Sequence, residues 1–311
     1  MTKQQRNYQP DWKNYSERSN RLMLSLLLWI TLNLGRPVVK LILYPITLYF
    51  IFFSPSAKAA SKNYLARALG HPPTWLQVWK HFYTFAQTSV DRCYFLSKKT
   101  QLFNIRTYGL DVIKQYVDQK QGCLLMISHL GSFDVLRVHG TREESLPIRI
   151  LMDRQHNPII MQLIDTLDPE LADRIIDTNQ SAPSLALTLD QCLKSGDMIG
   201  IMADRAHLGE KVETCEFLGK PAAFPLGPWQ LATVLKVPVI LCVGVFEGGN
   251  NYSLHIELLT KKIVSSRNGR QEAITSNMTH YVKRLEHHLI QAPFNWFNFY
   301  DFWTNDASKT D

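Results

Sequence analysis

Apolar and polar positions follow two different patterns along the chain. From about residue 101 onward, short apolar runs alternate with segments in which apolar residues recur at helical spacing. A short apolar run bounded by turn residues is typical of a buried strand. The runs that predict strands are 103–108, 123–128, 148–152, 174–177, 198–203, 239–246 and 252–258.

Helical periodicity fills the gaps between these strands. Helices are predicted near 111–119, 133–140, 157–167, 184–195, 226–236 and 271–290, and two more, at 57–69 and 74–96, precede the first strand. Strands that alternate with helices indicate an α/β fold with a largely parallel central sheet flanked by helices. The aromatic residues of 74–96 fit either an ordinary core or a groove for lipid chains.

Two apolar runs, 22–34 and 38–53, flank Gly35-Arg36-Pro37. A spanning helix needs about 20 apolar residues, so the runs form one kinked span, two short helices within one leaflet, or a buried hairpin. Trp29 and the tyrosines among the leucines favour a membrane anchor. In residues 1–21, lysine and arginine outnumber acidic residues five to two, which favours a cytoplasmic N-terminus. No cleavage site of a removable signal peptide follows.

This pattern divides the chain into three parts: residues 1–55, a basic segment and membrane anchor; residues 56–100, a helical region; and residues 101–311, an α/β catalytic domain.

Composition and charge narrow the classes of function. The 311 residues are 45% hydrophobic and 20% charged, which is globular and not disordered. The net charge of +7 suits nucleic acid or an anionic membrane, but the basic residues are not gathered into a nucleic-acid patch. Five scattered cysteines without a C-x-x-C pair indicate reduced core residues.

Known cofactor and metal motifs are absent from the sequence. It contains no P-loop, no dinucleotide-binding glycine loop and no serine-hydrolase elbow. The ten histidines lack metal-ligand spacing, and the helix that carries His287 and His288 is expected to expose them to solvent. We therefore expect neither a metal nor a tightly bound cofactor.

The segment CLLMISHLGSFDVLRVHG, residues 123–140, carries the candidate chemistry. His129 directly follows a predicted strand, and ligands of parallel α/β sheets gather at the carboxyl ends of strands. Ser132 has the character of an N-cap, which places Asp134 in the first turn of a helix. A carboxylate beside an imidazole fixes one tautomer and raises its basicity, so His129 and Asp134 are the predicted catalytic pair.

The helix start adds a second feature. Free N–H groups around Gly131 to Phe133 are expected to stabilise an oxyanion. A purely structural histidine and a helix-start acid placed by electrostatics are the plainer interpretation of the same residues.

Several segments together resemble the lysophospholipid acyltransferase superfamily, in particular its lipid A biosynthesis (lauroyl/myristoyl) branch. SHLGSFD is similar to the first motif of that branch, RQHNPII (154–160) to the second, and 200–232, which includes FLGKPA, to the third. VPVI (237–240) is similar to its final strand, and WFNFYDFW (296–303) resembles an ending found in a less characterised branch. The motifs occur in the family's order from about residue 20 to 303.

The resemblance implies a membrane-associated acyltransferase that moves a fatty acyl group from an acyl thioester to a hydroxyl group of a lipid or glycolipid. His129 would be the general base and Asp134 its orienting partner. The co-substrate would be acyl carrier protein or coenzyme A thioester, and the location the cytoplasmic face of a bacterial inner membrane. The residues that would bind substrates are Gly131, Ser132, Arg154, Asp204, Arg205 and Gly219.

Departures from the family leave other functions open. Asp153-Arg154 stands where the lipid A enzymes often carry Arg-Pro, and Phe224-Pro225-Leu226-Gly227 lacks the glutamate of glycerol-phosphate acyltransferases, which disfavours a phosphate-headed acceptor such as lysophosphatidic acid. The same base would also serve a thioesterase or an N-acyltransferase. A lipid-binding membrane protein without catalysis is the alternative outside the enzymes. Chain length, acceptor and oligomeric state are not predicted.

Overall fold

Seven strands form the central sheet of the computed structural model, which describes residues 21–137, 146–155, 158–206, 209–266 and 268–303. Their order across the sheet is β1-β9-β8-β2-β5-β3-β4. Every neighbouring pair is parallel except β8 and β9. The strands are β1 (Asn104–Tyr108), β2 (Cys123–Ile127), β3 (Ile148–Met152), β4 (Ile175–Asp177), β5 (Met198–Met202), β8 (Val239–Gly248) and β9 (Asn251–Thr260).

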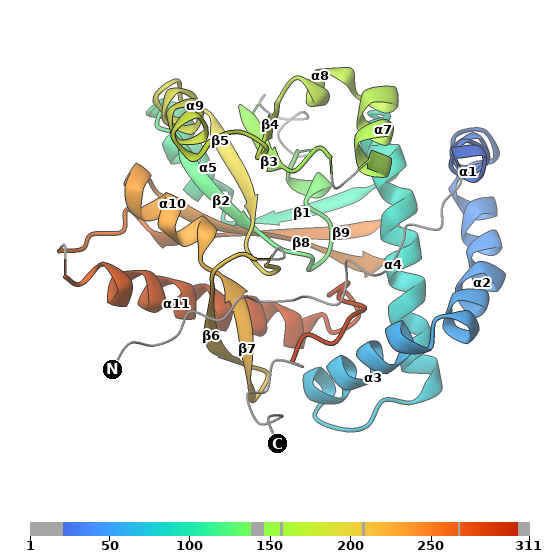
Figure 1. The fold of residues 1–311 in the computed structure, drawn as a ribbon. Coiled ribbons are helices and arrows are strands. Elements are labelled where there is room, and N and C mark those ends of the chain that lie inside the picture. Colours follow the sequence, from blue (N-terminus) through green and yellow to red (C-terminus); the bar gives the residue numbers. More distant parts are fainter. Residues whose placement is uncertain (1–20, 138–145, 156–157, 207–208, 267, 304–311) are drawn as a thin grey trace.

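Helices surround this sheet (Figure 1). Four precede it along the chain: α1 (Arg21–Leu34), α2 (Arg36–Phe53), α3 (Pro55–Leu69) and α4 (Trp75–Leu96). The others are α5 (Leu110–Asp118), α7 (Pro158–Leu167), α8 (Pro169–Ala172), α9 (Ala182–Lys194), α10 (Gly227–Leu235) and α11 (Arg270–Gln291). A 3₁₀ turn, η2 (Thr100–Leu102), leads into β1.

The predicted α/β fold is therefore confirmed, and each predicted strand is present with ends that agree within two residues. Strand β2 shows why the pattern was readable. Its alternate residues enter two cores: Leu124 and Met126 pack with α9, α10 and α11, whereas Cys123, Leu125 and Ile127 pack with α2, α4 and α5. Because both faces are covered, the strand reads as one continuous apolar run.

A second sheet was not predicted. Strands β6 (Val212–Phe217) and β7 (Lys220–Pro225) form an antiparallel hairpin. Leu218 and Gly219 form its turn, with φ angles of +50° and +73°, the left-handed conformations that a tight two-residue hairpin requires. The two glutamates of β6 and the lysine and two prolines of β7 hide the alternation that marks a half-buried strand. Gly219, predicted to bind substrate, lies in this turn.

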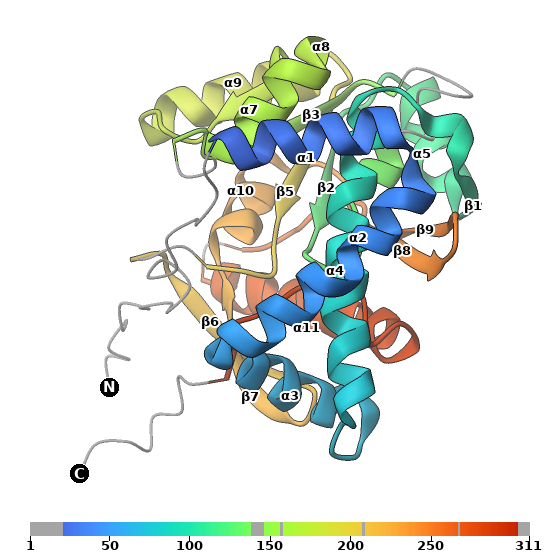
Figure 2. The same ribbon diagram turned by 90° about the vertical axis from the view of Figure 1, so that its right-hand side faces the viewer.

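Helices α1 to α4 agree with the apolar and aromatic helices predicted near the N-terminus. Helix α2 is long and apolar enough to cross a membrane and is the one such helix in the described part of the chain. Figure 2 shows α1 to α4 together on one side of the molecule. Core residues of α3 and α4 also pack with the sheet's own cluster, so the boundaries at residues 55 and 100 stay a prediction.

Two predictions about side chains have clear outcomes. The five cysteines are free and four of them are buried, as expected for reduced core residues. The expectation for His288 was wrong: the side chain is buried, and its Nε2 lies 2.7 Å from Glu257 Oε1. The sequence misled because His288 lies among charged residues, while the carboxylate that holds it comes from strand β9.

Candidate active site

His129 lies at the carboxyl end of β2, next to the carboxyl end of the neighbouring strand β5. Asp204 follows β5 by two residues, and its side chain is fully buried, whereas 30% of the His129 side chain is exposed. His129 Nδ1 and Asp204 Oδ1 are 2.9 Å apart, and the backbone N–H of His129 donates to Asp204 Oδ2 at 3.0 Å. Asp204 thus fixes both the ring and the backbone of His129.

A third donor completes the surroundings of this carboxylate. The indole Nε1–H of Trp296, a fully buried residue, donates to Asp204 Oδ2 at 3.2 Å. The backbone of the same segment contacts the loop that follows β2 (residues 128–133, the histidine loop). There the N–H of Phe297 donates to the His129 carbonyl at 3.0 Å. WFNFYDFW was noted in the sequence only as part of a family resemblance. Nothing local to it indicated that its first residue, Trp296, contacts Asp204.

Electrostatics set the protonation of the pair. Burial, and then the positive charge of Arg205, lower the pKa of His129 below its usual value, with a smaller effect from Arg92, against the opposing influence of Asp204. Burial alone would raise the pKa of Asp204, but the charge and hydrogen bonds of His129, with Arg205, hold it below its usual value. At neutral pH the ring is therefore neutral and the carboxylate ionised, so Nδ1 carries the proton and donates it to Asp204. Nε2 is left as the basic nitrogen.

These shifts predict the pH dependence of catalysis. A histidine acts as a base only in its neutral form, so activity is present above its pKa and is lost as pH falls through it. Because that pKa is lowered, kcat/KM should stay constant from pH 8 down to about 6.5, the ordinary pKa of histidine, and fall only below it. A pH–rate profile whose acid limb begins above pH 7 would contradict this assignment.

Asp134 takes a different place from the one predicted. It was expected to orient His129, but the carboxylate bonded to Nδ1 belongs to Asp204. Asp134 instead accepts from Arg92 Nε at 2.8 Å and from Ser132 Oγ at 3.3 Å. Residues 134–137 are helical, as expected, and the rest of the predicted helix to 140 lies outside the described residues. The spacing of the motif therefore places Asp134 correctly on a helix start, but its described partners are Arg92 and Ser132.

The predicted oxyanion donors are mostly occupied. The amide of Gly131 donates to the Asn295 carbonyl at 2.8 Å, and that of Ser132 to the Gly244 carbonyl at 2.7 Å. The prediction for these two amides is therefore wrong, because the loop uses them to attach to β8 and to the C-terminal segment. Among the described residues, the amide of Phe133 has no such partner. Of the three amides predicted as oxyanion donors, that of Phe133 therefore remains as the candidate.

Gly131 has a structural reason to be glycine. Its φ is +73°, and a Cβ atom there would lie 1.8 Å from the carbonyl oxygen of Gly244. No side chain fits this approach of backbone to backbone. The residue therefore lets the histidine loop lie directly against β8.

Of the remaining predicted residues, Arg205 and Arg154 lie beyond the carboxyl ends of strands of the central sheet, whereas Gly219 lies in the β6–β7 turn. Arg205 follows Asp204, donates to the Phe297 carbonyl and lies 5.5 Å from the ring of Tyr300. Arg154 follows β3, one strand beyond β5, where its Nη2 donates to the Ala172 carbonyl at 3.5 Å. No described contact joins Arg154 or Gly219 to His129. The structure thus brings His129, Asp204 and Arg205 together, with Asp134 and Ser132 close by along the chain.

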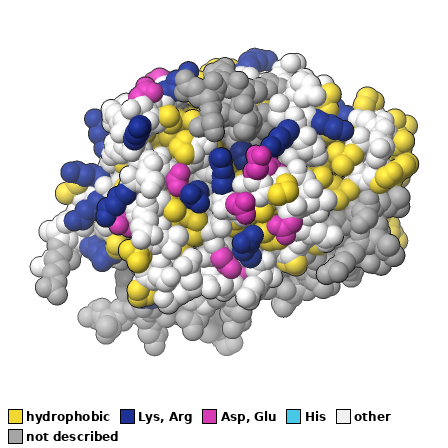
Figure 3. All heavy atoms as spheres, turned by 90° about the horizontal axis from the view of Figure 1, so that it is seen from above, with side chains coloured by type: hydrophobic (Ala, Val, Ile, Leu, Met, Phe, Trp, Pro, Cys, Tyr) yellow, Lys and Arg dark blue, Asp and Glu magenta, His cyan; other side chains and the backbone are white. Residues whose placement is uncertain are grey.

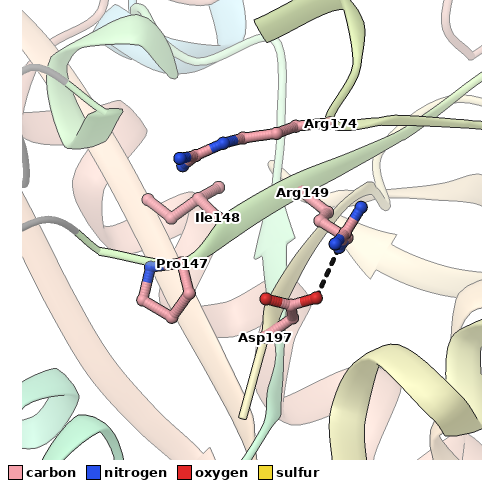
Figure 4. A pocket seen from close by; sticks show the side chains of 5 residues that line it. All are labelled: Pro147, Ile148, Arg149, Arg174 and Asp197. Carbon is pink, nitrogen blue, oxygen red and sulfur yellow. Dashed lines mark hydrogen bonds and ion pairs between the residues drawn. The ribbon is translucent and has the colours of Figure 1, made fainter. Parts of the chain in front are cut away.

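A small pocket lies at the other end of the strands, their amino ends, and is shown in Figure 4. It is lined by Pro147, Ile148, Arg149, Arg174 and Asp197, and Arg149 pairs with Asp197. These residues lie at or just before the amino ends of β3, β4 and β5. The pocket is therefore separated from His129 by the length of the strands. Among the described residues, no group of three or more His, Cys, Asp or Glu side chains is placed to hold a metal ion.

A histidine paired with a buried carboxylate, at the carboxyl ends of the strands of a mostly parallel α/β sheet, is an arrangement that suits general-base catalysis. The family model described as bacterial lipid A biosynthesis acyltransferase matches residues 18–305, almost the whole chain. The chain belongs to this family and is an acyltransferase, as the resemblance predicted. A comparison with curated proteins gives no match.

Proposed function

We propose that the protein transfers a fatty acyl group from an acyl thioester to a hydroxyl group of a lipid or glycolipid acceptor at a membrane. The observation that carries the mechanism is the pairing of His129 Nδ1 with the buried Asp204, which leaves Nε2 as a base. The donor is an acyl carrier protein or coenzyme A thioester. The site lies on the cytoplasmic face of a bacterial inner membrane.

In the proposed reaction, His129 Nε2 removes the proton of the acceptor hydroxyl while that oxygen attacks the thioester carbonyl. The tetrahedral intermediate then collapses, its C–S bond breaks, and the imidazolium returns the proton to the departing thiolate. The products are an ester and a free thiol, so no acyl-enzyme forms. Asp204 stabilises the imidazolium and keeps the ring from turning.

Several neighbouring groups have proposed roles beside the ring. Arg205 and Arg92 both act electrostatically on His129, and their guanidinium groups suit the phosphates of the donor or an anionic acceptor. Asp134 would hold Arg92 in this position through its ion pair, and the amide of Phe133 is the proposed oxyanion donor. Ser132 would fix Asp134 through its hydroxyl.

Mass spectrometry of lipids from cells with and without the gene tests this function. Deletion should remove one lipid class that is heavier by one ester-linked acyl chain and should accumulate its lighter precursor. A plasmid copy should restore the acylated lipid, whereas a His129→Ala copy should not. Unchanged lipids with an enlarged pool of intact acyl thioesters would instead indicate a thioesterase.

A further inference from the structure

The exposed large apolar side chains of the described residues are concentrated on three of the first four helices, α1, α2 and α4. Of the 18 large hydrophobic side chains exposed in the described part of the chain, 12 lie between Trp29 and Phe85. Seven of them are on α2: Val38, Leu41, Tyr44, Tyr49, Phe50, Phe52 and Phe53. Seen from above in Figure 3, hydrophobic side chains gather along the right-hand edge, the side on which Figure 1 places α1 and α2.

Up to residue 90, the charged residues of these helices are all positive. Asp91, which follows on α4, is buried and paired with Arg36. Residues 21–90 contain seven lysines and arginines and no aspartate or glutamate. That excess equals the net charge of the entire chain, +7. Lys62 and Lys80 are exposed, and Lys58 is half-buried. Apolar and aromatic side chains beside only positive charge complement the surface of a bilayer that contains anionic lipids.

The opposite side of α2 is closed against the protein. Its buried residues, Arg36, Val39, Leu43, Thr47 and Ile51, recur every three or four positions along the whole helix. This stripe faces α4, where Tyr83 Oη donates to the Lys40 carbonyl at 3.1 Å. Helix α2 is therefore amphipathic in its packing even though nearly all its residues are apolar.

A buried ion pair fixes the first turn of α2. Arg36 donates to both oxygens of Asp91 on α4, each at 2.6 Å, and Tyr252 Oη on β9 donates to the same carboxylate at 2.7 Å. Arg36 also donates to the Gly249 carbonyl at 2.6 Å, in the turn between β8 and β9. Separating such a pair leaves an unpaired buried charge, which is strongly destabilising.

A helix that crosses a bilayer is surrounded by lipid or by other spanning helices. If α2 crossed in this packing, α4 and the edge of the sheet with its charged and polar groups would have to enter the hydrocarbon as well. We propose that α1 to α4 form the surface by which the protein lies on an anionic bilayer, with α2 parallel to the membrane plane and its outer face in one leaflet. This inference specifies the membrane association of the proposed function and rests on it.

Depth measurements on α2 test the geometry. Leu41 and Phe52 are 70% and 66% exposed and lie 11 residues apart, which is about 16 Å along a helix and about three full turns. Full-length protein carrying Leu41→Cys or Phe52→Cys, in a Cys192→Ala background because the other cysteines are buried, is labelled with a fluorophore. It is then bound to phosphatidylglycerol–phosphatidylcholine vesicles whose lipids carry quenchers at known depths.

The in-plane arrangement predicts the same shallow depth for both labels. A spanning helix predicts label depths that differ by most of the about 16 Å between the two positions. That result would overturn the proposal while leaving membrane association intact. Val264→Cys, 72% exposed in the segment after β9, is the matched control and should not be quenched by any lipid. Because the readout does not use activity, failure here is distinct from failure of acyl transfer.

Vesicle flotation tests the charge. Binding should rise at least tenfold when phosphatidylglycerol replaces part of a neutral phosphatidylcholine vesicle. Lys58→Gln/Lys62→Gln/Lys80→Gln should lose most of that gain, whereas the exposed pair Lys261→Gln/Lys262→Gln should not. Equal binding to neutral and anionic vesicles, or a stable dimer in solution that does not bind vesicles, would contradict the proposal.

Discussion

His129→Ala is expected to lower kcat for acyl transfer by a factor on the order of 10²–10⁴, the usual contribution of a general base. The loss should fall on kcat more than on KM, because the base acts in the transition state and not in holding the acceptor. The variant should still fold, since 30% of the side chain is exposed and the backbone bonds of the loop remain. Rates with an acyl thioester and its lipid acceptor, beside a thermal melt, measure both effects.

His287→Ala is the matched control for this variant. His287 is exposed on α11 and bonds only to Gln291 on its own helix among the described residues. It should retain the wild-type rate and its pH profile. If His129→Ala retained a comparable rate, His129 would not be the base, whatever its contacts.

Asp204→Asn is expected to lose nearly as much activity as His129→Ala, because it moves the ring proton of His129 from Nδ1 to Nε2. Oδ2 of Asp204 receives two donors, the backbone N–H of His129 and the indole of Trp296. An asparagine must therefore turn its oxygen to that side and its NH₂ toward His129 Nδ1. The ring then accepts at Nδ1 and carries its proton on Nε2, so it has no basic nitrogen for the acceptor.

Two measurements separate this effect from simple destabilisation. The ¹⁵N chemical shifts of the His129 ring should show a proton on Nδ1 in the wild type and on Nε2 in Asp204→Asn. Glu257→Gln is the matched control, because Glu257 holds His288 in a similar pair away from the site; it should change neither the His129 tautomer nor the rate. Asp204→Asn with wild-type activity would remove Asp204 from the mechanism.

Asp134→Asn distinguishes the two carboxylates. Since Asp134 bonds to Arg92 and Ser132, its replacement should leave the His129 tautomer unchanged whatever its effect on the rate. A switch of the His129 tautomer in this variant would show that Asp134 orients the ring, as the motif spacing predicted.

The sequence predicts what depends on local pattern. Each strand of the central sheet is readable because residues such as Leu124 and Leu125 enter cores on opposite faces, and His129 is found because it directly follows such a strand. The family resemblance adds Asp204 and Arg205 as site residues. The pairing of these residues is not local, since Asp204 is 75 positions from His129 and Trp296 is 92 from Asp204.

The mistakes have the same origin. Four residues separate His129 from Asp134, which made Asp134 the obvious partner, whereas parallel pairing of β2 with β5 is what brings Asp204 beside the ring. The amides of Gly131 and Ser132 seemed free because their acceptors lie on β8 and beyond α11. Only the assembled sheet decides which carboxylate and which amides are available.

The dependence of thioester cleavage on the acceptor tests the central claim most directly. Purified full-length protein in anionic lipid is mixed with an acyl thioester, with and without a lipid acceptor that has a free hydroxyl, and both the thiol and the acyl ester are quantified. Base-catalysed transfer by His129 predicts thiol release only with the acceptor, one ester for each thiol, and a loss of both products by the same factor on the order of 10²–10⁴ with His129→Ala. Thiol released at the same rate without acceptor, as free fatty acid, would contradict it.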